Sequence, residues 1–313
     1  MTQRNLGNSG LLVSTVGLGC NNFGMRIDQE ASVKVIDRAI EQGITLFDTA
    51  DIYGNAGGSE TIIGETLGSR RKDIVLATKF GMQLDDAGKL KGASRRYIVS
   101  AVEASLKRLQ TDYIDLYQLH APDELTPMEE TLRALDDLVT QGKVRYIGCS
   151  NVPAWQVADA QWISKELGKN RFISCQDEYS LLMRSAEKEL MPAARQFGMG
   201  LLPYFPLASG LLTGKYKRDL IPEGTRFASA QRARDRYMTE RNWAIVEQLE
   251  SFVQSRGKGL LDLAISWLLA QSPVSSVIAG ATKPEQIDQN IAAGTWILSQ
   301  DELDEVAKIT APE

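Results

Sequence analysis

The stretch Gly17-Leu18-Gly19-Cys20-Asn21-Asn22 follows the first apolar run of the sequence and decides between two α/β folds. An open, doubly wound parallel sheet normally carries G-x-G-x-x-G at this turn, because the glycines let the backbone approach a phosphate group. Here Asn22 stands at the third glycine position, so the pattern is incomplete. The turn therefore favours the competing fold, a closed barrel of parallel strands.

Short apolar or β-branched runs alternate with helix-like stretches along the rest of the chain. The runs expected to be strands are Val13–Gly19, Thr45–Asp48, Ile74–Lys79, Tyr113–His120, Val144–Cys149, Phe172–Asp177, Gly200–Tyr204 and Ser276–Ala279. The stretches expected to be helices are Glu30–Glu41, Glu60–Leu67, Ser94–Leu109, Pro127–Val139, Pro153–Leu167, Ala186–Phe197, Leu260–Leu269 and Pro284–Ala292. Eight strands that are each followed by a helix predict a single α/β domain over residues 1–313, a (β/α)8 TIM barrel.

Three segments depart from the plain repeat. Arg4–Leu6 and Leu11–Ser14 flank Gly7-Asn8-Ser9-Gly10, which is typical of an N-terminal β-hairpin. Residues 205–240 form a long polar, basic stretch after the seventh strand, and a loop of that length in a compact domain is more often functional than neutral. Arg241–Arg256 is predicted to be an extra helix before the eighth strand.

Composition excludes several classes of partner. The 313 residues carry 35 basic and 40 acidic side chains, a net charge of −5, so the dense positive field of a nucleic-acid-binding protein is absent. The opening residues show no secretory signal, and the apolar stretch Leu260–Ala270 is too short to span a bilayer, so no membrane association is expected. The chain has three cysteines, Cys20, Cys149 and Cys175, and they lack the spacing of a zinc site. This predicts reduced thiols, no metal and a cytoplasmic protein.

Polar side chains recur where the expected strands end. They are Asp48, Lys79, His120, the pair Ser150-Asn151, Gln176 and Tyr204. In a barrel, side chains at the carboxyl ends of the strands converge on one open face. Any one of these residues has an ordinary structural explanation, such as capping a turn, but six strand ends in succession indicate a functional site. His120 is the only histidine of the chain.

Tyr53, five residues past Asp48, completes this set. Its ordinary pKa of about 10 makes a tyrosine a poor acid at neutral pH. A nearby ammonium lowers that pKa by stabilising the phenolate, and a carboxylate paired to the ammonium holds it in place. We therefore expect Tyr53, Lys79 and Asp48 to form a proton relay, with His120 aligning a carbonyl oxygen beside the tyrosine hydroxyl.

A series of short motifs, ordered over the full length of the chain, resembles the aldo-keto reductase family. The motifs are Arg4–Gly10, Phe47–Gly54, Ser59-Glu60, Ala77–Gly81, Leu119-His120, Gly142–Asn151, Gly210–Tyr216 and Ile278–Thr282. The resemblance implies reduction of an aldehyde or ketone to an alcohol, with NADP(H) as the preferred cofactor and NAD(H) as the alternative. By position it makes Tyr53 the proton donor, Lys79 and Asp48 the groups that tune it, and His120 the group that orients the substrate.

The resemblance also implies a cofactor that lies extended across the barrel mouth. It assigns Ser150, Asn151 and Gln176 to the nicotinamide carboxamide and Tyr204 to the ring face. The backbone around Ser209 and Gly210, together with Lys215 and Arg226, is assigned to the pyrophosphate. The remaining residues expected at the cofactor are Asn22, Phe23, Asp48, Pro206, Leu207, Gly280 and Thr282.

Two of these segments have other possible roles. Ser209–Lys215 looks like a P-loop, but only three residues separate its glycines and Tyr216 follows the lysine, so a nucleoside triphosphatase is excluded. Thr282-Lys283-Pro284-Glu285 matches a helix capping box, and a helix N-terminus also attracts phosphate. We expect Lys283, Gln286, Gln289 and Asn290 to hold the adenosine 2′-phosphate and adenine. Many family members carry arginine where Gln286 stands, which leaves Lys283 as the main charge for NADPH.

The substrate pocket is expected to have apolar walls beside the reacting groups Tyr53 and His120. The walls are Phe23, Met82, Phe205 and the segment Leu84–Ala93, which suit an aldehyde or ketone with a hydrophobic body. Self-association stays open. Two other functions also stay open: a cofactor-binding regulatory protein resembling potassium-channel β subunits, with little turnover, and a Schiff-base aldolase that uses Lys79 as its nucleophile.

Overall fold

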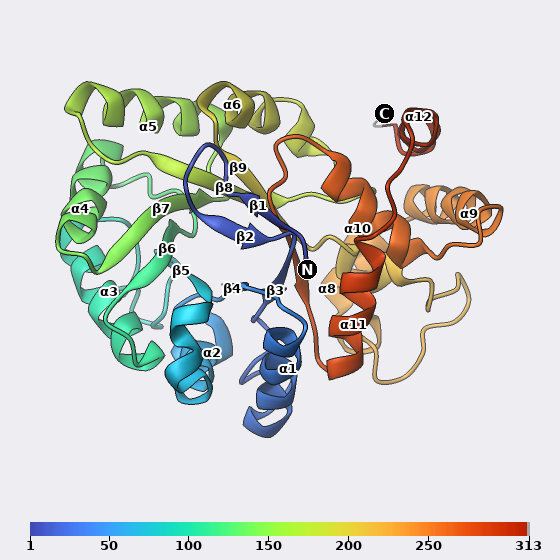
Figure 1. Ribbon diagram of the computed structural model, residues 1–313, viewed down its shortest axis with the longest axis horizontal. Helices are drawn as coiled ribbons and strands as arrows, with labels where there is room; N and C mark the ends of the chain where they lie inside the picture. Colours follow the sequence, from blue (N-terminus) through green and yellow to red (C-terminus); the bar gives the residue numbers. More distant parts are fainter. Residues whose placement is uncertain (312–313) are drawn as a thin grey trace.

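The computed structural model describes residues 1–311, and its centre is a sheet of eight parallel strands surrounded by helices (Figure 1). The strands are paired in the order β10-β3-β4-β5-β6-β7-β8-β9. Their bounds are β3 (Val16–Gly19), β4 (Leu46–Asp48), β5 (Val75–Phe80), β6 (Ile114–Leu119), β7 (Val144–Ser150), β8 (Phe172–Glu178), β9 (Gly200–Tyr204) and β10 (Val277–Gly280). The predicted (β/α)8 fold is confirmed.

The barrel closes between β9 and β10 through a short contact. Leu201 forms a parallel bridge with Val274, just before β10 begins. The Leu201 N–H donates to the carbonyl of Pro273 at 3.0 Å, and the Ser275 N–H donates to the carbonyl of Leu201 at 3.0 Å. Closure therefore gives hydrogen-bond partners to backbone groups at the two outer strands of the sheet.

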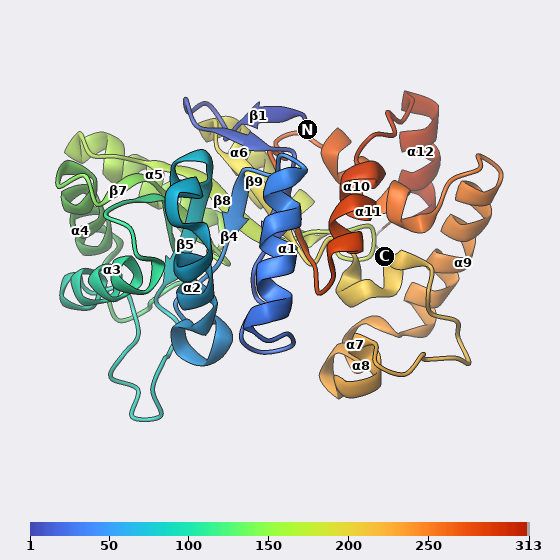
Figure 2. The ribbon, with the colours of Figure 1, turned by 60° about the horizontal axis from the view of Figure 1, so that its bottom comes forward.

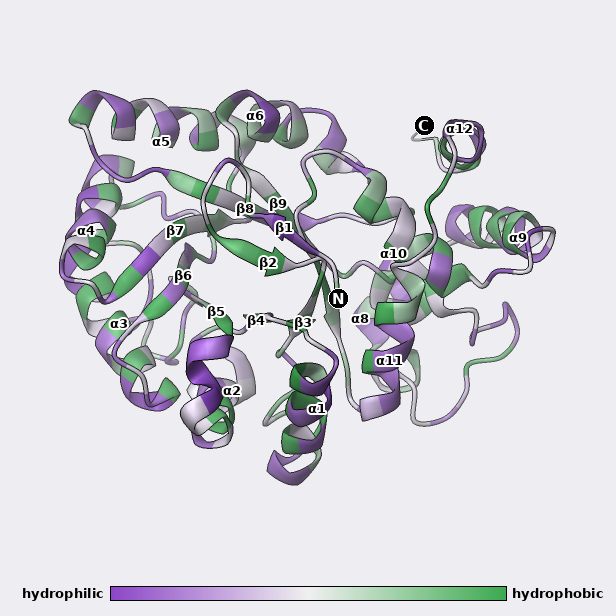
Figure 3. Cartoon of the chain, viewed as in Figure 1, coloured by the Kyte–Doolittle hydropathy of each residue, from purple (hydrophilic) through white to green (hydrophobic). Residues whose placement is uncertain are grey.

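The helices that follow the strands cover the outside of the barrel. They are α1 (Gln29–Glu41), α2 (Tyr53–Leu67), α3 (Arg95–Leu109), α4 (Met128–Thr140), α5 (Ala154–Leu167), α6 (Leu190–Phe197), α10 (Leu260–Ala270) and α11 (Pro284–Ala293). Figure 3 shows hydrophobic and hydrophilic residues side by side on helices such as α1 and α11. That mixture is expected for helices with one face in a core and the other in water. No helix within residues 1–311 is both long and apolar enough to cross a membrane.

The remaining elements lie outside the eightfold repeat. They are the strands β1 (Gln3–Asn5) and β2 (Leu12–Ser14), the short 3₁₀ helices η1 (Gly68–Asp73), η2 (Ser185–Glu187) and η3 (Ala208–Thr213), and the helices α7 (Arg226–Ser229), α8 (Gln231–Tyr237), α9 (Glu240–Gln254) and α12 (Gln300–Ile309). The extra helix expected before the eighth strand is α9. The long stretch expected as a loop contains η3, α7 and α8.

Three expected elements differ from those observed. The run Val13–Gly19 is divided, because β2 pairs with β1 in the hairpin and the chain turns at Thr15 before β3 enters the barrel. The helix expected over Ala186–Phe197 begins only at Leu190, after η2. Helix α12 was not predicted, although its start carries a clear signal, since Ser299 and Glu302 form a capping box.

The hairpin closes one end of the barrel. Leu6 and Val13 are fully buried and pack against apolar residues that point into the barrel from five strands: Leu46, Ala77, Leu116, Leu202 and Ile278. Figure 2 shows the hairpin at the end opposite to α7 and α8. Because residues two apart on a strand face the same side, the positions that follow this apolar layer also point into the barrel. They are Asp48, Lys79, Gln118 and Tyr204, at the open end.

Helices α2 and α3 approach each other closely at Gly64. A Cβ atom at this position would lie 2.3 Å from the Arg108 carbonyl oxygen and 2.6 Å from the Leu109 carbonyl carbon. We predict that Gly64→Ala lowers the free energy of unfolding by about 1–3 kcal/mol through overpacking, although alanine is the better helix former. Urea denaturation measures the change.

Gly58→Ala in the same helix is the matched control. A Cβ atom there meets nothing within 4 Å, and Gly58 begins the regular part of α2 after the non-helical residues 54–57, so alanine is expected to change stability by less than about 1 kcal/mol. Equal stability changes in the two variants would contradict the close contact between α2 and α3.

Candidate active site

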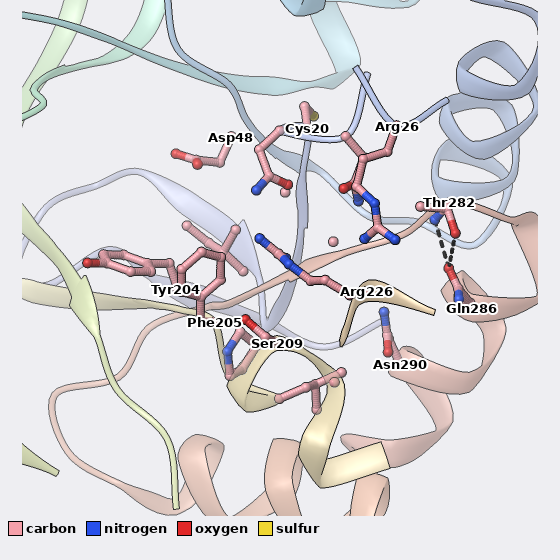
Figure 4. A pocket seen from close by; sticks show the side chains of 18 of the residues that line it. Cys20, Arg26, Asp48, Tyr204, Phe205, Ser209, Arg226, Thr282, Gln286 and Asn290 are labelled. Carbon is pink, nitrogen blue, oxygen red and sulfur yellow. Dashed lines mark hydrogen bonds between the residues drawn. The ribbon is translucent and has the colours of Figure 1, made fainter. Parts of the chain in front are cut away.

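A cavity of about 780 Å³ opens at the carboxyl ends of the strands (Figure 4). It gathers residues from all along the chain, as barrels do at this end. The predicted residues on its wall are Asn22, Asp48, Tyr53, Met82, His120, Ser150, Asn151, Gln176, Tyr204, Phe205, Pro206, Leu207, Ser209, Gly210, Lys215, Arg226, Gly280, Thr282, Lys283, Gln286, Gln289 and Asn290.

Some expected wall residues lie elsewhere. Phe23 is fully buried in the core between barrel and helices, so its ring is not available as a cavity wall. The segment Leu84–Ala93 also contributes no wall residue. Lys79 lies inside the barrel, behind Asp48 and Tyr53, and is fully buried.

The wall also contains residues that the sequence analysis missed. They are Gly19, Cys20, Asn21, Arg26, Thr213, Glu223, Gly224, Thr225, Leu261 and Ile278. The first three follow directly from the rule that strand ends line the mouth, since they end the first barrel strand or come just after it. The residues from the long stretch after β9 carried no such signal, because only the three-dimensional path of that stretch brings them to the cavity.

A buried ion pair lies at the base of the cavity. The Lys79 Nζ donates to Asp48 Oδ2 at 2.6 Å and to the Thr49 carbonyl at 2.8 Å. Asp48 Oδ1 accepts from the side-chain amides of Gln176 at 2.8 Å and Gln118 at 3.3 Å. These contacts compensate for the removal of both charges from water. Burial by itself lowers the pKa of Lys79, but Asp48 and Tyr53 outweigh it and raise that pKa, so the amine is protonated.

A protonated Lys79 argues against one of the alternative functions. A Schiff-base lysine attacks a carbonyl as the neutral amine, and enzymes obtain it by lowering the lysine pKa. The pKa of Lys79 is shifted in the opposite direction. This environment therefore does not suit a nucleophilic lysine.

Tyr53 lies directly beside this ion pair. The Lys79 Nζ is 5.1 Å from the centre of the Tyr53 ring, and the rings of Tyr53 and His120 meet edge to face with centres 5.7 Å apart. Burial raises the pKa of Tyr53, whereas Lys79 lowers it and Asp48 raises it again. The expected effect of Lys79 is present, but burial outweighs it, so the phenol stays protonated at neutral pH and can donate its proton.

His120 is a neutral imidazole at this site. Burial, reinforced by the positive charge of Lys79, lowers its pKa to about 3. Its Nδ1 is buried and has no hydrogen-bond partner within the described chain. The backbone carbonyl of His120 accepts from Asn151 Nδ2 at 3.0 Å, which links the residue to the end of β7. A neutral imidazole next to Tyr53 is available to bind a carbonyl oxygen.

A second buried carboxyl lies between Asp48 and Tyr53 in the chain. The Asp51 N–H donates to the Lys79 carbonyl at 3.2 Å, and the side chain is fully buried. Burial, followed by the charge of Glu60, raises the pKa of Asp51 to about 7. The region beneath the site therefore contains one carboxylate that is ion-paired, Asp48, and one carboxyl that holds its proton up to neutral pH, Asp51.

Amide and hydroxyl groups line the cavity beside the reacting residues. Ser150 is the last residue of β7 and Asn151 follows it, and the Asn151 Nδ2 donates to Ser150 Oγ at 3.0 Å. The Tyr204 hydroxyl donates to Asn151 Oδ1 at 2.8 Å, which fixes the aromatic ring at the end of β9. Together with Gln176, these groups can bind a planar carboxamide and cover one face of its ring.

Two arginines face each other in the middle of the cavity. The Arg226 guanidinium lies 5.0 Å from the centre of the Phe205 ring, and Figure 4 shows Arg26 and Arg226 between Asp48 and Tyr204 on one side and Thr282 and Gln286 on the other. Neither arginine forms an ion pair with a carboxylate in residues 1–311. Burial and the neighbouring Arg26 lower the pKa of Arg226. Two unpaired guanidinium groups favour an anion between them.

The backbone near these arginines has an uncommon conformation. Phe205, Ala208, Ser209 and Gly210 all have positive φ angles, and at Gly210 the angle is 102°. Conformations of this kind can turn successive N–H groups toward one concave surface that binds anions. A Cβ atom at Gly210 would lie 3.4 Å from the Lys215 Nζ, an ordinary contact that places this lysine beside the backbone of Gly210. The backbone N–H groups of this segment and the ammonium of Lys215 are therefore suited to binding a pyrophosphate.

The far end of the cavity is the N-terminus of α11. The expected capping box does not form: Lys283 is the N-cap, and the Thr282 N–H and hydroxyl donate to Gln286 Oε1 at 2.7 and 3.2 Å. The reason is that Pro284 occupies the first helical position, which shifts the helix start one residue past Thr282. Lys283 stands at this positive helix end and forms no ion pair with a carboxylate within residues 1–311.

Comparison with known proteins identifies the family of the chain. The model of the aldo/keto reductase family matches residues 15–311. An uncharacterized oxidoreductase of Bacillus subtilis, YrpG, is 40% identical over 92% of this chain and 89% of its own length. The versiconal hemiacetal acetate reductase of Aspergillus parasiticus is 34% identical over 97% of this chain and 95% of its own length. A protein of Arabidopsis thaliana named as a probable voltage-gated potassium channel subunit beta is 38% identical over 94% of this chain and 91% of its length.

The pKa of His120 gives a direct test of the site. We predict that its imidazole ¹H NMR signals do not titrate between pH 8 and 5, because the folded pKa is about 3. In urea the same signals are expected to titrate at about pH 6.5. Protonation therefore favours the unfolded chain as the pH falls below that value. A folded-state titration near pH 6.5 would mean that the imidazole is exposed. The assignment is unambiguous because the chain has one histidine.

Proposed function

The chain belongs to the aldo/keto reductase family and is an NAD(P)H-dependent oxidoreductase; we propose that it reduces an aldehyde or ketone to an alcohol with NADPH. The observation that carries this proposal is the meeting of four groups at the base of one cavity. They are a protonated phenol, a buried ammonium, its carboxylate partner and a neutral imidazole: Tyr53, Lys79, Asp48 and His120. We also propose that residues 1–313 act as one domain.

The cavity suits an extended dinucleotide. Its volume of about 780 Å³ lies within the range of cofactor sites, and its polar groups change in character along its length. Ser150, Asn151 and Gln176 would hold the nicotinamide carboxamide, with Tyr204 against the ring. Lys215, Arg226 and the backbone at Gly210 would hold the pyrophosphate. Asn22, Pro206, Leu207 and Gly280 would complete the wall. When bound, a reduced nicotinamide supplies the hydride.

The protein residues supply and position the proton. Tyr53 would donate its hydroxyl proton to the carbonyl oxygen, which becomes an alcohol as the hydride reaches the carbon. Because Lys79 is charged, it would stabilise the phenolate that remains, and Asp48 keeps that charge in place. His120 is neutral and would bind the carbonyl oxygen without competing for the proton. Met82 and Phe205 would contact the rest of the substrate.

The preference for NADPH is proposed from the N-terminus of α11. Lys283 stands there as a cation at a helix end that itself favours anions. The Gln286 oxygen is already bound by Thr282, so the amide group of that side chain is held in a fixed orientation. Lys283 and Gln286 would therefore bind the 2′-phosphate, and Gln289 and Asn290 would contact the adenine.

A second candidate function is favoured by one comparison. The Arabidopsis relative carries the name of a potassium channel β subunit, so a dinucleotide-binding regulatory protein with little turnover is the alternative. A panel of aldehydes and ketones, followed by the absorbance of the reduced nicotinamide, separates the two. Dinucleotide binding with negligible turnover across the panel would favour the regulatory function.

We predict that Tyr53→Phe lowers kcat for aldehyde reduction by about 100-fold or more, because the variant keeps the ring but lacks the proton donor. The dinucleotide affinity, measured by fluorescence titration, is expected to stay within about twofold. Tyr113→Phe, on a tyrosine outside the cavity, serves as the control and should retain wild-type kcat. Normal reduction by the Tyr53 variant would remove this hydroxyl from the mechanism.

We predict that Lys283→Ala weakens NADPH binding by about tenfold or more, since a hydrogen bond to a charged group is lost. NADH lacks the 2′-phosphate, so its affinity is expected to change by less than about twofold. Lys188→Ala, which removes an exposed lysine outside the cavity, should change neither affinity. If Lys283→Ala weakens both dinucleotides equally, the 2′-phosphate does not bind at this residue.

A further inference from the structure

Residues 214–237, here called the covering segment, form one wall of the cavity. They follow η3 and include α7 and α8. Five of them face the cavity: Lys215, Glu223, Gly224, Thr225 and Arg226. The position of this segment therefore determines whether the Arg226 guanidinium lies over the middle of the cavity, where Figure 4 shows it.

The covering segment has a small apolar core of its own. The rings of Tyr216 and Phe227 lie 4.8 Å apart and those of Phe227 and Tyr237 lie 6.5 Å apart, and all three residues are buried. Its exposed ion pairs join Lys217 to Glu250 and Arg218 to Glu240 and Glu247. Since these carboxylates all belong to α9, the exposed pairs connect the segment to that helix and not to the barrel.

A buried carboxylate connects the segment to the barrel itself. Glu178 is the last residue of β8 and pairs in register with Tyr204 of β9, on the cavity wall. Its Oε1 accepts from the Tyr237 hydroxyl and its Oε2 accepts from the Arg236 guanidinium. Both partners belong to α8, at the end of the covering segment. If the segment moved away, this buried carboxylate would lose both partners, which is unfavourable.

An opposing force acts at the cavity. Arg226 of the covering segment faces Arg26 of the loop after β3, and like charges without an anion between them repel. This repulsion would favour an outward position of the segment, whereas the contacts of Glu178 favour the position that the structure shows. A bound pyrophosphate would remove the repulsion.

We propose that Glu178 is a positioning residue that holds the covering segment, and with it Arg226, over the cavity through Tyr237 and Arg236, and thereby slows dinucleotide release. The inference rests on the proposed function only for the identity of the ligand. The contacts of Glu178 with the segment exist in the protein alone, so the holding role is testable without any ligand.

The first test is limited trypsin digestion of the full chain without added ligand. The covering segment contains cleavage sites at Arg226, Arg232 and Arg234. Cleavage of a native protein follows the population of the open state when reclosing is fast. Glu178→Gln is expected to increase cleavage at these sites by about tenfold, because two charge-assisted hydrogen bonds are weakened. Mass spectrometry locates the cuts, and NADP⁺ is expected to suppress them.

Glu240→Gln is the matched control. It removes a carboxylate that also pairs with the covering segment, through Arg218, but this pair is exposed and belongs to α9. Cleavage in the segment is expected to stay within about twofold of wild type. Tyr237→Phe keeps the buried ring and removes one donor to Glu178, so its cleavage rate should fall between those of wild type and Glu178→Gln. It also serves if Glu178→Gln fails to fold.

The second test is the rate of NADPH release, measured by stopped-flow fluorescence. Glu178→Gln is expected to raise the dissociation rate constant by about tenfold and Tyr237→Phe by less. Wild-type cleavage and wild-type release in both variants would overturn the proposal. If the wild-type protein bound no dinucleotide, the proposed function would fail, while the digestion experiment would still decide whether Glu178 holds the segment.

Discussion

The contact between Lys79 and Asp48 inside the barrel is the interaction on which the site depends. An ammonium with no access to water is tolerated only when a carboxylate and further acceptors surround it, and here Asp48 at the end of β4 and the carbonyl of Thr49 supply them. Gln118 and Gln176 bind the other carboxylate oxygen, so the charge of β5 is tied to β4, β6 and β8. The field of this pair then influences every reacting group. It opposes protonation of His120 and stabilises the phenolate form of Tyr53.

The barrel makes this arrangement possible by stacking two layers along the same strands. Alternation along a strand sends every second side chain inward, and the inward positions change from apolar to polar toward the carboxyl ends. Leu46 is followed by Asp48, Ala77 by Lys79 and Leu116 by Gln118. The hairpin residues Leu6 and Val13 complete the apolar layer from below. The same strands thus carry both the apolar layer that stabilises the barrel and the polar layer that forms the candidate active site.

The eight strands and the wall residues at strand ends could be predicted, because the repeat and the strand-end rule depend on spacing alone. The other cofactor residues on the wall were expected mainly from the resemblance to the reductase family. Prediction failed where three-dimensional context decides. Phe23 follows a strand end but turns into the core, and the effect of burial on the pKa of Tyr53 exceeds that of Lys79. Arg26 and Glu178 carried no local signal, because their partners are distant in the sequence. Helix α12 could have been found from Ser299 and Glu302.

The facing arginines have a practical consequence for work in solution. A cleft with two guanidinium groups that form no ion pair within residues 1–311 attracts inorganic phosphate and sulfate as well as a dinucleotide. These buffer salts would therefore compete at Arg26 and Arg226, and raising the ionic strength would weaken the attraction further. Apparent affinities of this protein consequently depend on the choice of buffer, and chloride or zwitterionic buffers of low ionic strength come nearest to the intrinsic value.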